Sequence, residues 1–312
     1  MLTLGELRHL RRTSGLRGAG LVLHAWGVIA AAITLSACVP SPLVLLLAVM
    51  VIGSRQLGLA VLMHEGGHWL LFPRGTMNTE VARWLCANPI WADLGRYRRQ
   101  HHLHHRHTHQ PGDPDLAVAD TYPVCRSALA WAALRDLSTC TFWADVFGWS
   151  GWREPRAGWR QLRGPLACNA AIATALAAAG HWELYLLLWL LPLATWYQLV
   201  SRVRKIAEHA VVVDRDDPLR NARTTAAGPI ARALLAPYWV NYHLEHHLLI
   251  FVPCWKLPQA HALLRAKGYE PRMEVASGYR EILARASGAG AHATSGSELH
   301  GRAQDLAPGR GQ

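Results

Sequence analysis

Four runs of apolar residues stand out along the chain, and each predicts a membrane-spanning helix. They cover residues 21–39, 43–63, 166–180 and 182–200. A helix needs about 20 mostly apolar residues to cross a bilayer, so the first and fourth runs fit well and the third is short. Short connections at 40–42 and 180–181 join the runs in pairs. The pattern predicts an all-α integral membrane protein with four transmembrane helices in two hairpins.

Two polar residues, Arg55 and Gln56, interrupt the second run. They lie either at the membrane edge of a helix that continues into water, or inside the helix bundle. An arginine within a membrane helix is a candidate functional residue. The sequence leaves both positions open.

The basic residues predict how the chain is oriented. Residues 72–165 carry twelve arginines, the N-terminal segment carries four more, and residues 201–205 read SRVRK. Neither hairpin connection contains lysine or arginine. By the positive-inside rule, both termini and the long segment 72–165 are expected to be cytoplasmic. In a bacterium this would place the protein in the inner membrane.

Composition supports a membrane protein with a substantial polar part, since 51% of the residues are hydrophobic and 17% are charged. The net charge of +11 fits either nucleic acid or a membrane surface. Because the arginines follow the predicted topology, we expect no nucleic-acid partner. The six cysteines form no CxxC pair and indicate neither a disulfide framework nor a structural zinc site. One membrane domain is predicted over residues 1–287, followed by a disordered tail at 288–312.

The strongest chemical signal is the spacing of the histidines, which form three clusters. HEGGH contains His64 and His68, HHLHH contains His101, His104 and His105, and HLEHH contains His243, His246 and His247. Residues three and four apart share one face of a helix, so each cluster can direct its rings to one place. All three clusters lie in segments predicted to be cytoplasmic, where the hairpins would hold them at one level as a helical cap.

Eight converging imidazoles exceed what one metal ion accepts, so the pattern predicts two metals. Imidazole binds zinc, copper, iron and nickel. A zinc ion normally takes only three or four protein ligands. A site with many nitrogen ligands and no cysteines therefore favours a pair of redox metals, with iron as the expected element.

The arrangement H-x3-H, H-x2-HH and H-x2-HH, divided by two hairpins, resembles the integral-membrane fatty acid desaturase family. YRRQHHLHHRHTHQPGDPDL at 97–116 is similar to the family's second histidine box, and NYHLEHHL at 241–248 to its third. The resemblance covers about residues 54–264. It implies one further histidine ligand before the third box, for which His209 is the candidate. The family often places an asparagine near the site, but Lys205 stands four residues before His209.

The resemblance implies oxygen-dependent desaturation of a fatty acyl chain at two Fe2+ ions, with dioxygen as co-substrate. The implied ligands, which would also be the catalytic residues, are His64, His68, His101, His104, His105, His209, His243, His246 and His247. The chain contains no flavin, dinucleotide or iron–sulfur motif. An external electron donor of ferredoxin or cytochrome type is therefore expected, and exposed arginines could attract an acidic donor.

Other interpretations of the same residues stay open. A hydroxylase or ketolase acting on a lipid, alkyl chain or carotenoid could use the same di-iron site. HEGGH alone matches the HExxH motif of zinc proteases, with Glu65 as general base. The tract at 98–110 alone would fit a metal-buffering polyhistidine segment.

Several residues near the clusters have both a structural and a functional interpretation. Each of these residues could form a turn, cap a helix, or contact a metal ligand from outside and orient it. They are Asp113, Asp115, Glu208, Glu245 and Asn241. Residues 69–72 and 236–240, which adjoin two boxes, either pack in the core or contact the substrate. Outer or solvated roles are expected for His102, His107 and His109, and structural roles for His24, His181 and His261.

Overall fold

The structure is a computed structural model, which describes residues 2–147 and 155–288. The described chain is mostly helical, as predicted. It also contains a small parallel pair that was not predicted, β1 (Thr224–Thr225) with β2 (Val275–Ala276). The predicted tail lies outside the described residues, apart from Gly288.

The first hairpin begins after a short amphipathic helix. The three helices are α1 (Leu4–Leu10), α2 (Gly15–Cys38) and α3 (Pro42–Gly67). The side chains of Ser14 and Ser41 accept hydrogen bonds from backbone N–H groups at the starts of α2 and α3, which satisfies donors that a helix start leaves open. α2 and α3 pack along each other, and α3 also contacts two of the three later helices that carry the histidines.

Short helices follow α3 and lead to the second histidine cluster. They are α4 (Gly75–Val81), η1 (Ala82–Ala87), η2 (Asn88–Ile90), α5 (Leu94–His107), α6 (Leu116–Asp120), α7 (Arg126–Leu137) and α8 (Cys140–Phe147). α5 is the longest of these and carries the whole HHLHH cluster. It begins at the N-cap Asp93, whose carboxylate accepts the N–H of Arg96 at 2.6 Å.

The second predicted hairpin is confirmed only in part. Its helices are α9 (Pro155–Ala178), α10 (Glu183–Tyr185), η4 (Leu186–Leu190), α11 (Leu191–Ala194) and α12 (Trp196–His209). By length and composition, three described helices could cross a membrane, namely Gly15–Cys38, Pro42–Gly67 and the continuous run Glu183–His209. Most of the third predicted span, residues 166–180, falls in α9, which is not among them; the first half of α9 is polar and contains Pro165.

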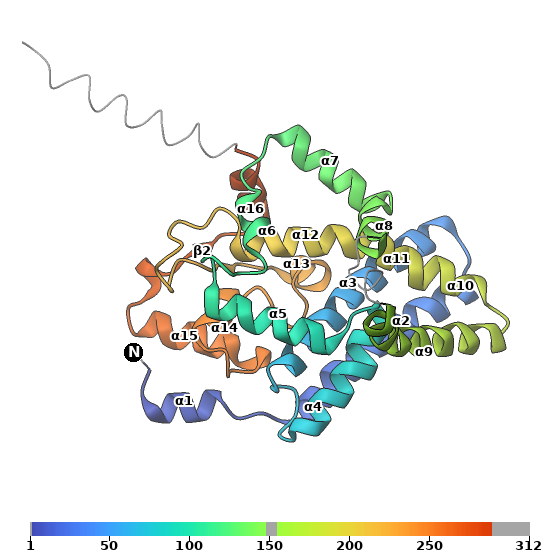
Figure 1. The fold of residues 1–312 in the computed structure, drawn as a ribbon, viewed down its shortest axis with the longest axis horizontal. Coiled ribbons are helices and arrows are strands. Elements are labelled where there is room, and N and C mark those ends of the chain that lie inside the picture. Colours follow the sequence, from blue (N-terminus) through green and yellow to red (C-terminus); the bar gives the residue numbers. More distant parts are fainter. Residues whose placement is uncertain (1, 148–154, 289–312) are drawn as a thin grey trace, which may run out of the picture.

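The C-terminal part returns to the middle of the molecule. Its helices are α13 (Pro229–Leu234), η5 (Pro237–Trp239), α14 (His243–Leu248), η6 (Cys254–Lys256), α15 (Leu257–Ala266), η7 (Glu270–Arg272) and α16 (Tyr279–Ala286). Figure 1 shows α5, α12 and α14 in the middle, with α9 and α10 at one end and α1 and α15 at the other. The three histidine-bearing segments that follow α3 therefore surround one place.

The structure resolves the position of the two polar residues in the second run. Arg55 is 7% exposed and Gln56 is fully buried. Gln56 donates a hydrogen bond to the carbonyl of Trp189 at 2.8 Å, which ties α3 to η4. Both residues therefore face the interior of the bundle.

Candidate metal centre

Four helices bring the nine predicted histidines together. α3 carries His64 and ends at His68, which is its C-cap residue. α5 and α14 each carry three more, and His209 is the last residue of α12. α3 and α12 end at these histidines, and α14 begins at His243.

The histidines divide into two groups, each compact enough to hold a metal ion. The ligand nitrogens within each group lie within 4.8 Å of one another. The five-histidine group consists of His64, His68, His101, His105 and His246. The four-histidine group consists of His104, His209, His243 and His247.

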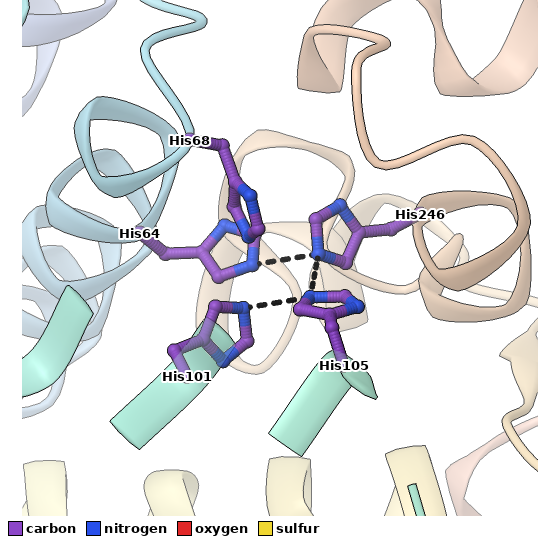
Figure 2. Close-up of side chains that lie close together, drawn as sticks. All are labelled: His64, His68, His101, His105 and His246. Atoms are coloured by element: carbon purple, nitrogen blue, oxygen red, sulfur yellow. Dashed lines mark hydrogen bonds between the residues drawn. The ribbon is translucent and has the colours of Figure 1, made fainter. Parts of the chain in front are cut away.

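In the five-histidine group, the rings of three helices face a common space (Figure 2). The Nε2 atom of His246 lies 2.9 Å from the Nε2 atoms of both His64 and His105. The Nε2 atoms of His101 and His105 are also 2.9 Å apart. The Nε2 atom of the fifth ring, His68, is buried and has no hydrogen-bond partner.

The four-histidine group has the same internal spacing. The Nε2 atom of His209 lies 3.1 Å from that of His104 and 2.9 Å from that of His243. The Nε2 atoms of His243 and His247 are 3.1 Å apart. The two groups adjoin each other, because the ring centroids of His105 and His247 are 4.3 Å apart.

These distances fit metal coordination. Two imidazole nitrogens bound to one ion at about 2.1 Å and at a right angle stand about 3.0 Å apart. Burial lowers the pKa of His68 to about 3 and that of His105 to about 2, and it holds the pKa of His246 and His247 well below the usual value. These imidazoles are therefore neutral near pH 7, which leaves a lone pair free for a metal. The residues present fit a pair of metal ions.

The four-histidine group has partners on the outer nitrogen of each ring. His104 Nδ1 lies 2.9 Å from Asp113 Oδ1. His209 Nδ1 lies 3.3 Å from the carbonyl oxygen of Asn221, and His243 Nδ1 lies 3.4 Å from Glu208 Oε1. The hydroxyl oxygen of Thr108 is 3.5 Å from the outer nitrogen of His247. Such contacts fix the tautomer that presents Nε2 to a metal.

Asp113 combines the two roles that the sequence left open. Its carboxylate contacts His104 and also accepts the backbone N–H groups of His109 at 2.9 Å and Asp115 at 2.8 Å. It therefore shapes the loop and orients a predicted ligand. Asp115 is different, since its side chain is 57% exposed and its carboxylate is 3.9 Å from His104.

The other acidic candidates connect the site to its surroundings. Glu65 accepts the N–H of Cys254 at 2.8 Å and is 1% exposed. It joins α3 to η6, a role that does not match the general base of a zinc protease. Glu245 accepts hydrogen bonds from Thr224 and from His261, the latter at 2.7 Å.

Asn241 does not cap α14. The N-cap residue is Tyr242, and no side chain caps that helix. The amide nitrogen of Asn241 instead donates to the carbonyl of Thr225 at 2.9 Å, which joins β1 to the third cluster. Lys205, at the position where the family often has an asparagine, is exposed on α12.

The remaining histidines lie outside the two groups. His109 packs against His209 and contacts the carbonyl oxygen of Asn221 at 2.8 Å, so it forms part of the wall of the site. His102 lies against Trp69, and His107 is half-buried. His24 contacts the hydroxyl of Tyr238 and His181 contacts Glu183, in agreement with structural roles.

The two segments beside the boxes differ from each other. Leu71 and Phe72 are buried in the core, and Asn78 accepts both of their N–H groups. Packing therefore accounts for this part of 69–72. Residues 236–239 line a cavity between α2, α3 and α13.

Arg98 positions two of the clusters, and no sequence pattern pointed to it. Its guanidinium donates to the carbonyls of Gly66 at 3.0 Å and Gly67 at 3.1 Å, and it stacks over Trp69 at 4.2 Å. It thereby binds the open end of α3 to α5. The chain contains many arginines, and nothing in the sequence distinguishes Arg98 from the others. Only its contacts in the structure reveal this role.

Comparison with known proteins agrees with the geometry. The chain belongs to the fatty acid desaturase family, which it matches over residues 40–278. It is 27% identical over 282 residues to a dihydrorhizobitoxine desaturase of Bradyrhizobium elkanii, covering 83% of this chain and 78% of that protein. It is also 27% identical over 246 residues to a β-carotene ketolase of Paracoccus sp. strain PC1, covering 77% of this chain and 86% of the relative. The chain is therefore an oxidoreductase of this family.

Proposed function

We propose that the protein is a membrane desaturase that introduces a C=C bond into a fatty acyl chain at a pair of irons. The observation that carries this proposal is the division of nine imidazoles into two adjoining groups with metal-like spacing. Nitrogen ligands without cysteine suit iron in this family. An unactivated methylene has no acidic proton, so acid–base side chains alone cannot attack it.

One iron would be held by the five-histidine group and the other by the four-histidine group. Together they would bind dioxygen and supply the oxidising power that removes two hydrogens from neighbouring carbons. Those two hydrogens, with two further electrons and two protons from outside the site, would reduce the dioxygen to two water molecules. The protein's own contribution is positional. Asp113, Glu208 and Thr108 keep the Nε2 lone pairs of the four-histidine group directed inward, and the buried surroundings exclude bulk water.

Electrons would come from an external ferredoxin or cytochrome-type donor. A cavity of about 250 Å³ contacts both groups, because its lining includes His105 and His247 as well as Arg106 and Arg215. Positive side chains beside the metals would attract an acidic donor protein. Reduction rates that do not change with ionic strength would contradict this part of the proposal.

The proposed topology keeps four membrane spans, with α9 as the short third one, and places both termini and the histidines in the cytoplasm. The basic residues of 72–165 and of 201–205 support this orientation. In a bacterium the protein would lie in the inner membrane. Cysteine labelling at the hairpin connections, with a reagent that cannot cross membranes, tests the orientation.

Oxygen insertion is the second candidate function, and the β-carotene ketolase relative favours it. The same site could act as a hydroxylase or ketolase, because the two outcomes diverge only after the first hydrogen has been removed. Mass spectrometry of the product separates them, since desaturation removes two hydrogens and hydroxylation adds one oxygen.

The deciding experiment is expression in a host with simple lipids, followed by fatty acid profiling. A new unsaturated fatty acid is expected with the wild type and none with His104→Ala. Metal analysis of the purified protein is expected to give iron. One zinc per chain without iron, together with an unchanged lipid profile, would reject the proposal in favour of zinc chemistry.

A further inference from the structure

A second cavity lies away from the histidines, between α2, α3, α13 and η5. Its volume is about 490 Å³. Leu21, Val28 and Val51 give it apolar walls from the two membrane-type helices. Arg55 and Arg232 line the same cavity. An apolar chamber with two cationic side chains is unusual beside a membrane span, and the family reaction does not account for it.

Arg55 is a buried cation without a matching anion. It is 7% exposed, donates a hydrogen bond to the carbonyl of Ala233, and lies 5.7 Å from the centre of the Tyr238 ring. Among residues 2–147 and 155–288, no carboxylate lies within ion-pair distance of it. A guanidinium offers five N–H donors, of which the carbonyl accounts for one and the Tyr238 hydroxyl, also within hydrogen-bonding reach, for another.

The surroundings favour an anion in this cavity. A charge held in apolar surroundings is costly unless it is paired and hydrogen-bonded. Arg232 adds a second positive charge at the cavity, and the Tyr238 hydroxyl, 3.1 Å from His24 Nδ1, adds a polar group. Arginine presents its donors in a planar fork that matches carboxylate and phosphate oxygens.

The backbone beside this cavity has an unusual conformation. Tyr238 and Trp239 both have positive φ angles, 54° and 59°, which side chains of their size rarely adopt. A Cβ atom on Gly58 would lie 2.8 Å from the Tyr238 ring, so glycine there leaves room for the ring. Such conformations persist only where the surrounding structure fixes them.

The cavity is separate from the metal centre. Arg55 and His64 are nine residues apart on α3, which places them about half a turn apart around the helix and roughly 13 Å apart along it. Arg55 therefore faces α13, whereas His64 faces the histidine groups. A ligand of this cavity would lie on the other side of α3 from the two histidine groups.

We propose that this cavity binds the anionic head group of an amphiphile, with Arg55 as its main partner and its alkyl chain along Leu21, Val28 and Val51. A lipid phosphate and a fatty acid carboxylate share this chemistry. The proposal goes beyond desaturation and does not depend on it, because it assigns a binding site that needs no metal.

The test uses the purified full-length protein in phosphatidylcholine nanodiscs. Phosphatidylglycerol or palmitate is added, and binding is followed by native mass spectrometry and by the thermal midpoint, which a ligand of the folded state raises. Extra phosphatidylcholine and methyl palmitate, which carry no net charge, serve as the control ligands. The wild type is expected to bind the anionic ligands in preference, and the more strongly bound of the two identifies phosphate or carboxylate.

Arg55→Gln is expected to weaken the anionic ligand at least about tenfold, because it removes charge-assisted hydrogen bonds. Arg265→Gln is the matched control, since Arg265 is exposed and pairs with Glu270 at 2.8 Å. Its binding should equal that of the wild type.

Equal binding of palmitate and methyl palmitate, together with no preference for phosphatidylglycerol, would overturn the proposal. This comparison uses only the wild type, so it decides even if Arg55→Gln does not fold. Unchanged anion binding by a folded Arg55→Gln would also overturn it. If the wild-type protein binds the anion but shows no desaturase activity, only the proposed function is contradicted, and the proposed binding site stands.

Discussion

The two histidine groups have the same internal spacing but are held in place in different ways. In the four-histidine group, every outer ring nitrogen faces an oxygen of the protein at 2.9–3.5 Å. In the five-histidine group, His64 Nδ1 lies 3.3 Å from Glu65 Oε1, but the outer nitrogen of His246 has no hydrogen-bond partner. Instead, Arg98 fastens α5 to the last carbonyls of α3.

The difference follows from where the ligands sit. Four of the five ligands in the first group come in pairs four residues apart, on α3 and α5, so helix geometry already aligns them. Both groups draw on three helices, but the four-histidine group contains only one such pair, His243 and His247. Its rings need individual partners because no single helix fixes their mutual positions. The five-histidine group therefore depends more on helix packing, and the four-histidine group more on side-chain contacts.

Removing one ligand from either group should have the largest effect. His104→Ala and His246→Ala should each lower the rate of desaturation by more than about 100-fold. This loss exceeds the roughly 10–100-fold loss typical when a residue that only contacts a metal ligand is replaced. Each variant should lose iron mainly from its own group, so iron content should fall from two toward one per chain. Mass spectrometric iron analysis and product profiling measure both effects.

His107→Ala is the control, because His107 is half-buried and outside both groups. Full iron content and activity in His246→Ala would show that the five-histidine group is not a metal site.

Arg98→Met should disturb the five-histidine group through the backbone. It removes hydrogen bonds from a charged donor to the carbonyls of Gly66 and Gly67, each worth about 1.5–3 kcal/mol. We expect a free energy of unfolding lower by about 3 kcal/mol and weaker iron binding in this group. Denaturant unfolding and iron titration provide the measurements. Arg99→Met, at an exposed position on the same helix, should change neither.

Asp113→Asn should disturb the four-histidine group through its side-chain contacts. Asparagine keeps the size but loses the charge that orients His104, so iron affinity should fall about 10–100-fold. Competition with a chelator measures this change. The control Asp115→Asn alters an exposed carboxylate 3.9 Å from the same ring and should have little effect. If Asp113→Asn lost iron equally from both groups, the two groups would not be held in place in different ways.

Gly66→Ala should have the smallest effect, confined to helix packing. A Cβ atom there would lie 2.2 Å from the Cβ atom of Ala82, so η1 would have to move away from α3. Overpacking of this kind costs about 1–3 kcal/mol. Thermal unfolding tests the loss. Gly67→Ala is the neighbouring control, because its new Cβ atom would meet only the Tyr97 ring at an ordinary 3.7 Å.

Much of the fold could be predicted because its signal is local. Long apolar runs gave α2, α3 and the run ending in α12, and the described chain is mostly helical as expected. The third run did not give a helix apolar enough to span by itself, since α9 carries Pro165 and a polar first half. The β1–β2 pair, two residues on each side and fifty apart in the chain, leaves no pattern that a sequence could reveal.

The sequence by itself determined which histidines converge. Spacings of three and four residues place rings on one helix face, and eight positions followed from that rule, with His209 added by resemblance. Only the tertiary structure decided how they divide: His101 and His105 join one group, while His104 on the same helix joins the other. It also decided that Arg55 is buried and that Glu65 binds the backbone of Cys254. The physical reason is that helix periodicity fixes the direction of a side chain, whereas its partners depend on how helices distant in sequence pack.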